Sequence, residues 1–131
     1  MVRHKTRLKR KAGLFPKKTM RLEKQMAIVV PSTKEFNKQI TKKEMMNRVR
    51  SVRNFLTENF GGSTRVKGIG SYSGKGGVVD ENVVVVEAFA DNPVWDKSKS
   101  SVSNFLRQKA RDWSQESVGY QLEGDLYLVE P

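Results

Sequence analysis

The chain has 131 residues, no cysteine and one histidine, and its formal net charge at pH 7 is +11. This length favours one domain with a single hydrophobic core. Without cysteine there are no disulfide bonds and no thiolate metal sites, and His4 alone supplies too few imidazoles for a histidine-based metal or catalytic centre. The longest clean apolar run, Met26–Val30, is far shorter than the roughly 20 residues of a membrane span, so we expect a cytoplasmic protein with no membrane association.

The charge is distributed unevenly along the chain. Residues 1–24 contain ten Lys or Arg and one acid, residues 25–75 carry a net +7, and residues 76–131 carry a net −5. Residues 1–24 also lack apolar periodicity and contain Gly13 and Pro16. We therefore interpret residues 1–24 as a basic flexible arm and residues 25–131 as a single domain.

The first half of this domain predicts a strand followed by a helix. Gln25–Pro31 (QMAIVVP) is short, rich in β-branched residues and apolar on both faces, which is typical of a central strand. After a polar loop, Thr41 and Glu44 have the spacing of a capping box and begin a helix over about 42–59. Glycines follow the helix, and its apolar stripe consists of Met45, Val49, Val52, Leu56 and Phe60.

The second half predicts two strands, a second helix and a last strand. Ser63–Tyr72 and the valine-rich Glu81–Ala90 are typical of strands. A helix is expected from about Ser98 to near Gly119, and Tyr120–Val129 alternates like a single strand. The helix has its apolar positions at Val102, Phe105, Leu106, Ala110 and Trp113, and we expect Trp95 and Trp113 to be core residues.

This order of elements predicts an α+β protein with a ferredoxin-like βαββαβ fold. Its four-stranded antiparallel sheet would carry two helices on one face. The first and third strands would lie in the middle, flanked by the fourth and the second.

The glycine-rich stretch Gly68–Gly77 (GIGSYSGKGG) invites comparison with a phosphate-binding loop. Such a loop requires a glycine where Ile69 stands and a Ser or Thr after its lysine, where this chain has Gly76. A valine strand also follows where a helix should begin. A β-hairpin explains the same residues better, and we expect no cofactor, although Lys75 at its tip could contact a partner.

The positive charge predicts a non-enzymatic protein that associates with DNA or RNA, or an adaptor, through phosphate contacts. The basic arm and the basic face of the first helix would supply the affinity. The candidate binding residues are Arg3, Lys5, Arg7, Lys9, Arg10, Lys11, Lys17, Lys18, Lys43, Arg48, Arg50, Arg53 and Lys75.

Two other functions remain open. Glu123 and Asp125, two apart on one strand, would share a face, and with Glu87 they could hold Mg²⁺ in a nuclease or phosphodiesterase. Against this, Glu87 could form a cross-strand pair with Arg65 or Lys67. The second of these functions is that of a self-assembling structural component. The apolar alternation of the third strand predicts an uncovered sheet face, and from it we expect a homodimer.

Three stretches resemble uncharacterised small α+β proteins of prokaryotic plasmids and viruses. They are IVVPST (Ile28–Thr33), NFGGSTR (Asn59–Arg65) and WSQESVGYQLEGDLYLV (Trp113–Val129). The resemblance covers Met26–Val129 and implies a mobile-element or viral setting. It implies no particular active site.

Overall fold

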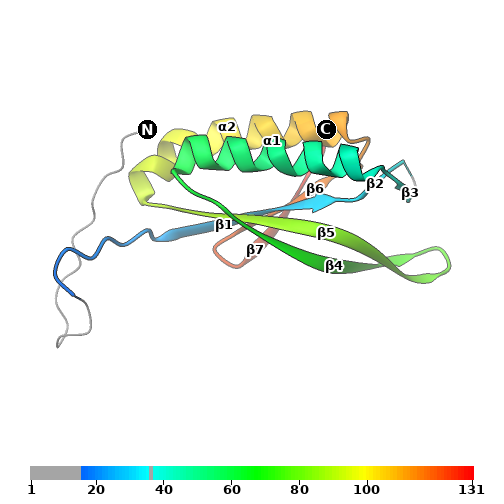
Figure 1. The fold of residues 1–131 in the computed structure, drawn as a ribbon, viewed down its shortest axis with the longest axis horizontal. Coiled ribbons are helices and arrows are strands. Elements are labelled where there is room, and N and C mark those ends of the chain that lie inside the picture. The colour runs from blue at the N-terminus through cyan, green and yellow to red at the C-terminus, as the bar shows by residue number, and fades with distance from the viewer. Residues whose placement is uncertain (1–15, 36) are drawn as a thin grey trace.

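The protein is described here by a computed structural model of residues 16–35 and 37–131. It has an α+β fold in which two helices lie side by side on one face of a five-stranded antiparallel sheet (Figure 1). The sheet order is β4-β5-β1-β6-β7, and β2 and β3 form a separate small hairpin. The elements are β1 (Lys24–Pro31), β2 (Thr33–Lys34), β3 (Lys38–Gln39), α1 (Lys42–Phe60), β4 (Thr64–Gly74), β5 (Gly77–Ala90), α2 (Asn92–Asp112), β6 (Val118–Leu122) and β7 (Asp125–Val129).

The sheet has five strands rather than the four expected from the sequence. The segment predicted as one strand, Tyr120–Val129, turns back on itself at Glu123 and Gly124, whose φ angles are 51° and 86°. β6 therefore pairs with β1 on one side and with β7 on the other. The alternation of apolar residues continues through the turn, which is why the pattern did not reveal the reversal.

The first helix follows its sequence signals. The Glu44 backbone N–H donates to Thr41 Oγ1 at 3.1 Å, and Gly61 ends the helix in the left-handed region with φ 85°. Val49, Val52, Leu56 and Phe60 are buried. This stripe packs mainly on β5 and β1.

The second helix begins at Asn92, earlier than the expected start near Ser98. Asp91 is its N-cap and accepts a hydrogen bond from the Val94 N–H at 2.9 Å. Pro93 is compatible with the first turn because the N–H that proline lacks has no partner within a helix there. The proline therefore marks the start of the helix, and the additional turn brings Trp95 into the core.

The core lies between the helices and the sheet. Phe60, Trp95 and Tyr120 stack in succession with centroid separations of 6.4 Å. Trp95 and Trp113 are both buried, so their assignment as core residues is confirmed. No described helix covers the opposite face of the sheet, here called the open face, which carries the side chains of Val83, Val85, Glu87 and Phe89 on β5.

The β4–β5 hairpin is longer than the rest of the sheet. Pairing between β1 and β5 ends at Pro31 opposite Val83, while β4 and β5 stay paired as far as Gly74 opposite Gly77. Figure 1 shows this end of the hairpin extending past the helices. The interpretation of the glycine-rich stretch as a hairpin is confirmed. Neither described helix is long and apolar enough to cross a membrane.

Candidate functional site

Where the structure describes them, the predicted nucleic-acid-binding residues lie in different environments. Arg3, Lys5, Arg7, Lys9, Arg10 and Lys11 lie outside the described residues. Lys17, Lys18, Lys43, Arg50 and Lys75 are exposed, and Arg53 is half-buried with hydrogen bonds to Asn54.

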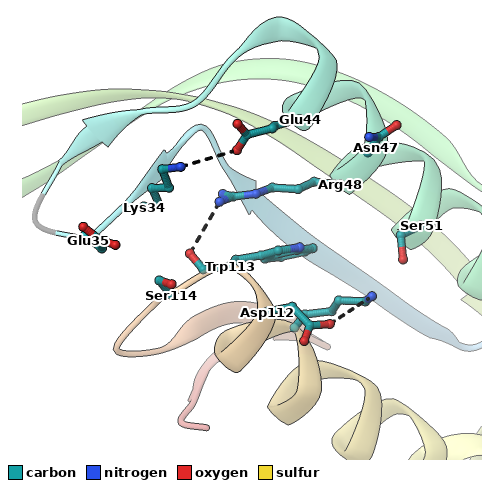
Figure 2. A pocket seen from close by; sticks show the side chains of 10 residues that line it. Lys34, Glu35, Glu44, Asn47, Arg48, Ser51, Asp112, Trp113 and Ser114 are labelled. Atoms are coloured by element: carbon teal, nitrogen blue, oxygen red, sulfur yellow. Dashed lines mark hydrogen bonds and ion pairs between the residues drawn. The ribbon is translucent and has the colours of Figure 1, made fainter.

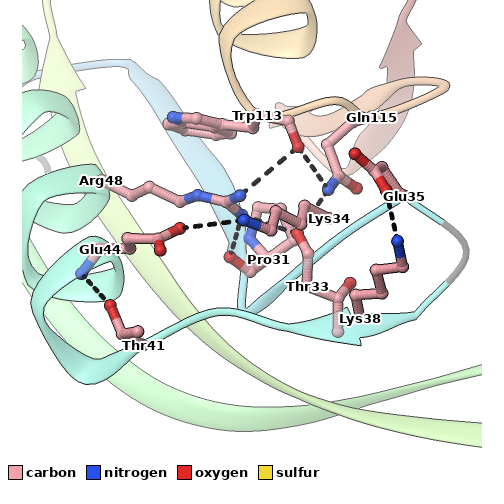
Figure 3. A network of polar contacts seen from close by, with 10 residues as sticks. All are labelled: Pro31, Thr33, Lys34, Glu35, Lys38, Thr41, Glu44, Arg48, Trp113 and Gln115. Atoms are coloured by element: carbon pink, nitrogen blue, oxygen red, sulfur yellow. Dashed lines mark hydrogen bonds and ion pairs between the residues drawn. The ribbon is translucent and has the colours of Figure 1, made fainter.

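Arg48 differs from the other predicted residues because its side chain is only 6% exposed. Figure 3 shows it reaching from α1 towards the end of β1 and the loop after α2. Its Nη1 donates to the carbonyls of Pro31 and Thr33 at 2.8 and 2.9 Å, and its Nη2 to the Trp113 carbonyl at 3.4 Å. The guanidinium lies 5.4 Å from the centroid of the Trp113 ring. Arg48 thus ties three segments together and is not part of the exposed basic surface.

Burial changes the electrostatics of this arginine. Loss of hydration lowers the pKa of the Arg48 guanidinium from its ordinary value, while Glu44 and Glu81 act in the opposite direction. Among the described residues no carboxylate forms an ion pair with it. Its charge is compensated mainly by backbone carbonyls.

The three carboxylates of the predicted Mg²⁺ site do not converge. Glu123 and Asp125 belong to a turn and to the strand after it, so they do not alternate along one strand. Glu87 and Glu123 each accept a hydrogen bond from Gln25. The side-chain amide of Gln25 donates to Glu87, and its backbone N–H donates to Glu123. Within residues 16–35 and 37–131 no group of three potential metal ligands is found. Glu87 also lies opposite Thr64, so the expected pair with Arg65 or Lys67 is wrong.

A different polar group gathers where β1 ends against β5. The hydroxyl of buried Thr33 donates to the carboxylate of half-buried Glu81. The Tyr72 hydroxyl, from the neighbouring strand β4, donates to the side chain of Asn37. Strand alternation places Glu81 and Tyr72 on the open face, in line with Val83 and Val85. We refer to Thr33, Asn37, Tyr72 and Glu81 as the Glu81 cluster.

Glu81 acts electrostatically on Arg48 but forms no ion pair with it. In a strongly basic chain, Glu81 has no ion pair with any described Lys or Arg. Its partner across β4 is Gly70, and Gly68 lies opposite Val83, so two neighbouring positions of the open face have no side chain. A Cβ added at Gly68 would lie 3.7 Å from the Val83 side chain. One added at Gly70 would lie 3.6 Å from Val83 and 3.9 Å from the Glu81 carbonyl oxygen. The cluster therefore borders an apolar strip formed by Val83, which is buried, and by the exposed Val66.

A second feature is an open groove of about 460 Å³ between α1 and the C-terminal end of α2 (Figure 2). Arg48 and Trp113 line it, together with Asn47 and Ser51 from α1 and Lys109 from α2. Thr33 connects the groove with the Glu81 cluster, because its carbonyl accepts from Arg48 while its hydroxyl binds Glu81.

Sequence reasoning missed Glu81 and assigned Arg48 to the wrong environment. A signal existed for Arg48, because it precedes Val52, Leu56 and Phe60 at steps of four and so continues the buried stripe. For Glu81 the signal was weaker. It is the polar residue that continues the alternation of Val83 and Val85 on the face left uncovered.

No family model and no curated protein matches this chain. Among solved structures, a phage SAM lyase in complex with S-methyl-5'-thioadenosine matches with a TM-score of 0.57 and 16% sequence identity. The apo state of a phage SAM lyase matches with a TM-score of 0.56 and 19% identity. Each match covers 82% of this chain and 89% of the other. The chain therefore shares the fold of these lyases.

Proposed function

We propose that this protein binds S-adenosylmethionine at the Glu81 cluster and cleaves it to S-methyl-5'-thioadenosine. The observation that carries the proposal is the carboxylate of Glu81, which is half-buried, fixed by Thr33 and unpaired with any described cation. A cationic substrate would supply the missing positive charge. S-adenosylmethionine is the candidate substrate because the chain shares the fold of phage SAM lyases.

The apolar strip beside Glu81 fits the rest of this substrate. Val66 of β4 is 50% exposed on the open face, next to Val83 and Val85 of β5. A flat nucleoside would lie on Val66 and Val85, beside Gly68 and Gly70, which carry no side chain. Apolar surface favours the neutral thioether product over the charged sulfonium, because the ion loses more hydration there.

The chemistry requires no external oxidant or reductant. S-methyl-5'-thioadenosine keeps the methyl group, the sulfur and the adenosyl group, so the bond broken joins sulfur to the four-carbon amino-acid chain. The bonding electron pair stays on sulfur. The four-carbon fragment leaves either as a lactone, after attack by its own carboxylate, or as an alkene, after loss of a proton.

We assign Glu81 to the ammonium group of the substrate. The ammonium keeps its charge throughout the reaction, so a carboxylate bound to it holds substrate and transition state equally. Placed against the sulfonium, the same carboxylate would stabilise the substrate more than the transition state and slow the cleavage. Tyr72, 44% exposed and oriented by Asn37, would line the nucleoside side of the site.

The test is incubation of the full chain with S-adenosylmethionine, followed by mass spectrometry of both products. With S-adenosylmethionine well below its KM, we expect S-methyl-5'-thioadenosine from the wild type and at least tenfold less from Glu81→Gln. Glu87→Gln is the matched control, because Glu87 lies on the same face of the same strand. Equal activity of Glu81→Gln and wild type, or no product and no binding by the wild type, would refute the proposal.

A second candidate function is the binding of DNA or RNA by the basic surface. Lys43 and Arg50 of α1 and Arg65 and Lys67 of β4 are exposed, and none has an ion pair within the described part of the chain. Such cations are available for phosphates, and the binding they support is steeply salt-dependent.

Fluorescence polarisation with labelled duplex and single strands at several salt concentrations tests this candidate. The double variant Lys43→Gln/Arg50→Gln should bind more weakly and show a shallower salt dependence. Lys97→Gln/Arg107→Gln removes the same charge from exposed positions of α2 and should have a smaller effect. Equal losses would point to net charge rather than to a surface on α1.

For the fold itself we propose the ferredoxin-like arrangement, with β6 and β7 in place of its fourth strand. A mobile-element or viral origin stays part of the proposal, and the phage proteins with this fold are consistent with it.

A further inference from the structure

The groove between α1 and the end of α2 has the features of a binding site that the proposed reaction does not use. Glu44, Asn47, Arg48 and Ser51 line it at steps of three and four, so they share one face of α1. Figure 2 shows the Arg48 side chain extending across the groove above Trp113.

Arg48 points to the chemistry of the ligand. Its side chain is more than nine-tenths buried and has three carbonyl contacts, although a guanidinium has five N–H donors. No carboxylate among residues 16–35 and 37–131 lies within ion-pair distance. A buried positive charge without an ion pair is costly, and an anion beside it would form charge-assisted hydrogen bonds.

Neutral donors lie next to this charge. The side chains of Asn47 and Ser51 line the groove and have no hydrogen-bond partner in the described part of the protein. Lys109 faces them from α2, with its Nζ 3.5 Å from Asp112 and 5.3 Å from the Phe105 ring centroid. We propose that the groove binds a small oxyanion, a carboxylate or a phosphate group, between Arg48, Asn47 and Ser51.

The rim of the groove limits the charge that it accepts. Glu44 lies 3.9 Å from Lys34, and Asp112 neutralises Lys109, so the acids at the rim are already paired. Arg48 is left as the cation of the groove without an ion pair, although Glu44 and Glu81 act on it at longer range. The site therefore suits an anion of low charge rather than a polyphosphate.

The fluorescence of Trp113 can report anion binding, because the Arg48 guanidinium lies over the Trp113 ring. The full-length chain carrying Trp95→Phe reports on Trp113 alone. Titration with sodium phosphate and, separately, with sodium acetate is carried out at constant ionic strength, balanced with sodium chloride. We expect a saturable fluorescence change with a dissociation constant on the order of 1 mM for one of the two anions. The anion that saturates distinguishes a phosphate site from a carboxylate site.

Variants locate the site. Asn47→Ala/Ser51→Ala should weaken binding about tenfold, since two hydrogen bonds are lost. Arg107→Gln lowers the net charge by one from an exposed position of α2 outside the groove and should leave the affinity unchanged. A response that does not saturate, absence of response to both anions, or an equal loss in Arg107→Gln would overturn the proposal. The site is independent of S-adenosylmethionine cleavage, which this titration does not involve.

Discussion

Thr33 donates its hydroxyl hydrogen to the carboxylate of Glu81, a residue 48 positions further along the chain. The same threonine accepts a hydrogen bond from Arg48 through its carbonyl oxygen. One residue, two positions after the end of the central strand β1, therefore holds both the carboxylate of the open face and the buried guanidinium of α1.

Replacing Thr33 by valine removes the hydroxyl and leaves the shape nearly unchanged. Glu81 then loses its hydrogen-bond donor while it remains half-buried. We expect the free energy of unfolding to fall by about 1–2 kcal/mol, measured by urea denaturation. Thr64→Val is the control, because Thr64 is exposed and lies on β4 opposite Glu87 of β5. A loss in Thr64→Val as large as in Thr33→Val would contradict this assignment.

Arg48→Met keeps an unbranched side chain on α1 but leaves the carbonyls of Pro31, Thr33 and Trp113 without this donor. We expect a loss of about 3 kcal/mol in unfolding free energy, measured by urea denaturation. Arg50→Met, two residues away and exposed, should change stability by less than about 0.5 kcal/mol. If the two variants unfold at the same urea concentration, the role given to Arg48 is wrong.

The raised pKa of Tyr120 predicts that the folded protein loses stability at high pH. Burial raises the pKa of Tyr120 from 10.0 to about 12, with a smaller contribution from Tyr127. The folded protein therefore holds the phenolic proton more tightly than the unfolded chain. The resulting stabilisation is complete below pH 10 and disappears between pH 10 and 12, up to about 2–3 kcal/mol.

Urea unfolding of wild type and Tyr120→Phe at pH 9 and pH 11 measures this effect. The wild type should lose more stability between the two pH values than the variant, in which the titrating group is absent. Tyr127→Phe, at a position 46% exposed, is the control and should keep most of the wild-type pH dependence, because Tyr127 makes the smaller contribution to the raised pKa. An identical pH dependence in wild type and Tyr120→Phe would exclude the effect.

The open face supports the expected homodimer as a further proposal. Leu126 and Leu128 of β7 are 60% and 66% exposed on this face, next to Val29 of β1. Apolar side chains gathered on one surface usually mark an interface. We expect the full-length chain to sediment as a dimer and Leu128→Glu to shift it towards the monomer. Met46→Glu, at an α1 position 60% exposed, should leave the dimer intact, and a monomeric wild type at high concentration would rule the dimer out.

The sequence predicted most elements because their signals are local. The cap at Thr41, the stripe from Val49 to Phe60 and Gly61 define α1 without reference to the rest of the chain. Glu123 was harder to interpret, since a non-glycine residue with positive φ turns the chain inside a continuous alternating pattern. The site was less predictable still. Glu81 acquires its role from Thr33, and no short-range pattern connects residues that distant.

The β4–β5 hairpin also determines where the chain tolerates insertion. Tyr72 and Glu81 share a face through alternation, so one residue inserted between Gly70 and Tyr72 would turn the phenol to the helix side. The turn after Gly74 lies beyond both residues, and Lys75 and Gly76 are exposed there. A peptide epitope grafted between Lys75 and Gly76 should therefore be displayed clear of the helices, with the register of Tyr72 and Glu81 preserved.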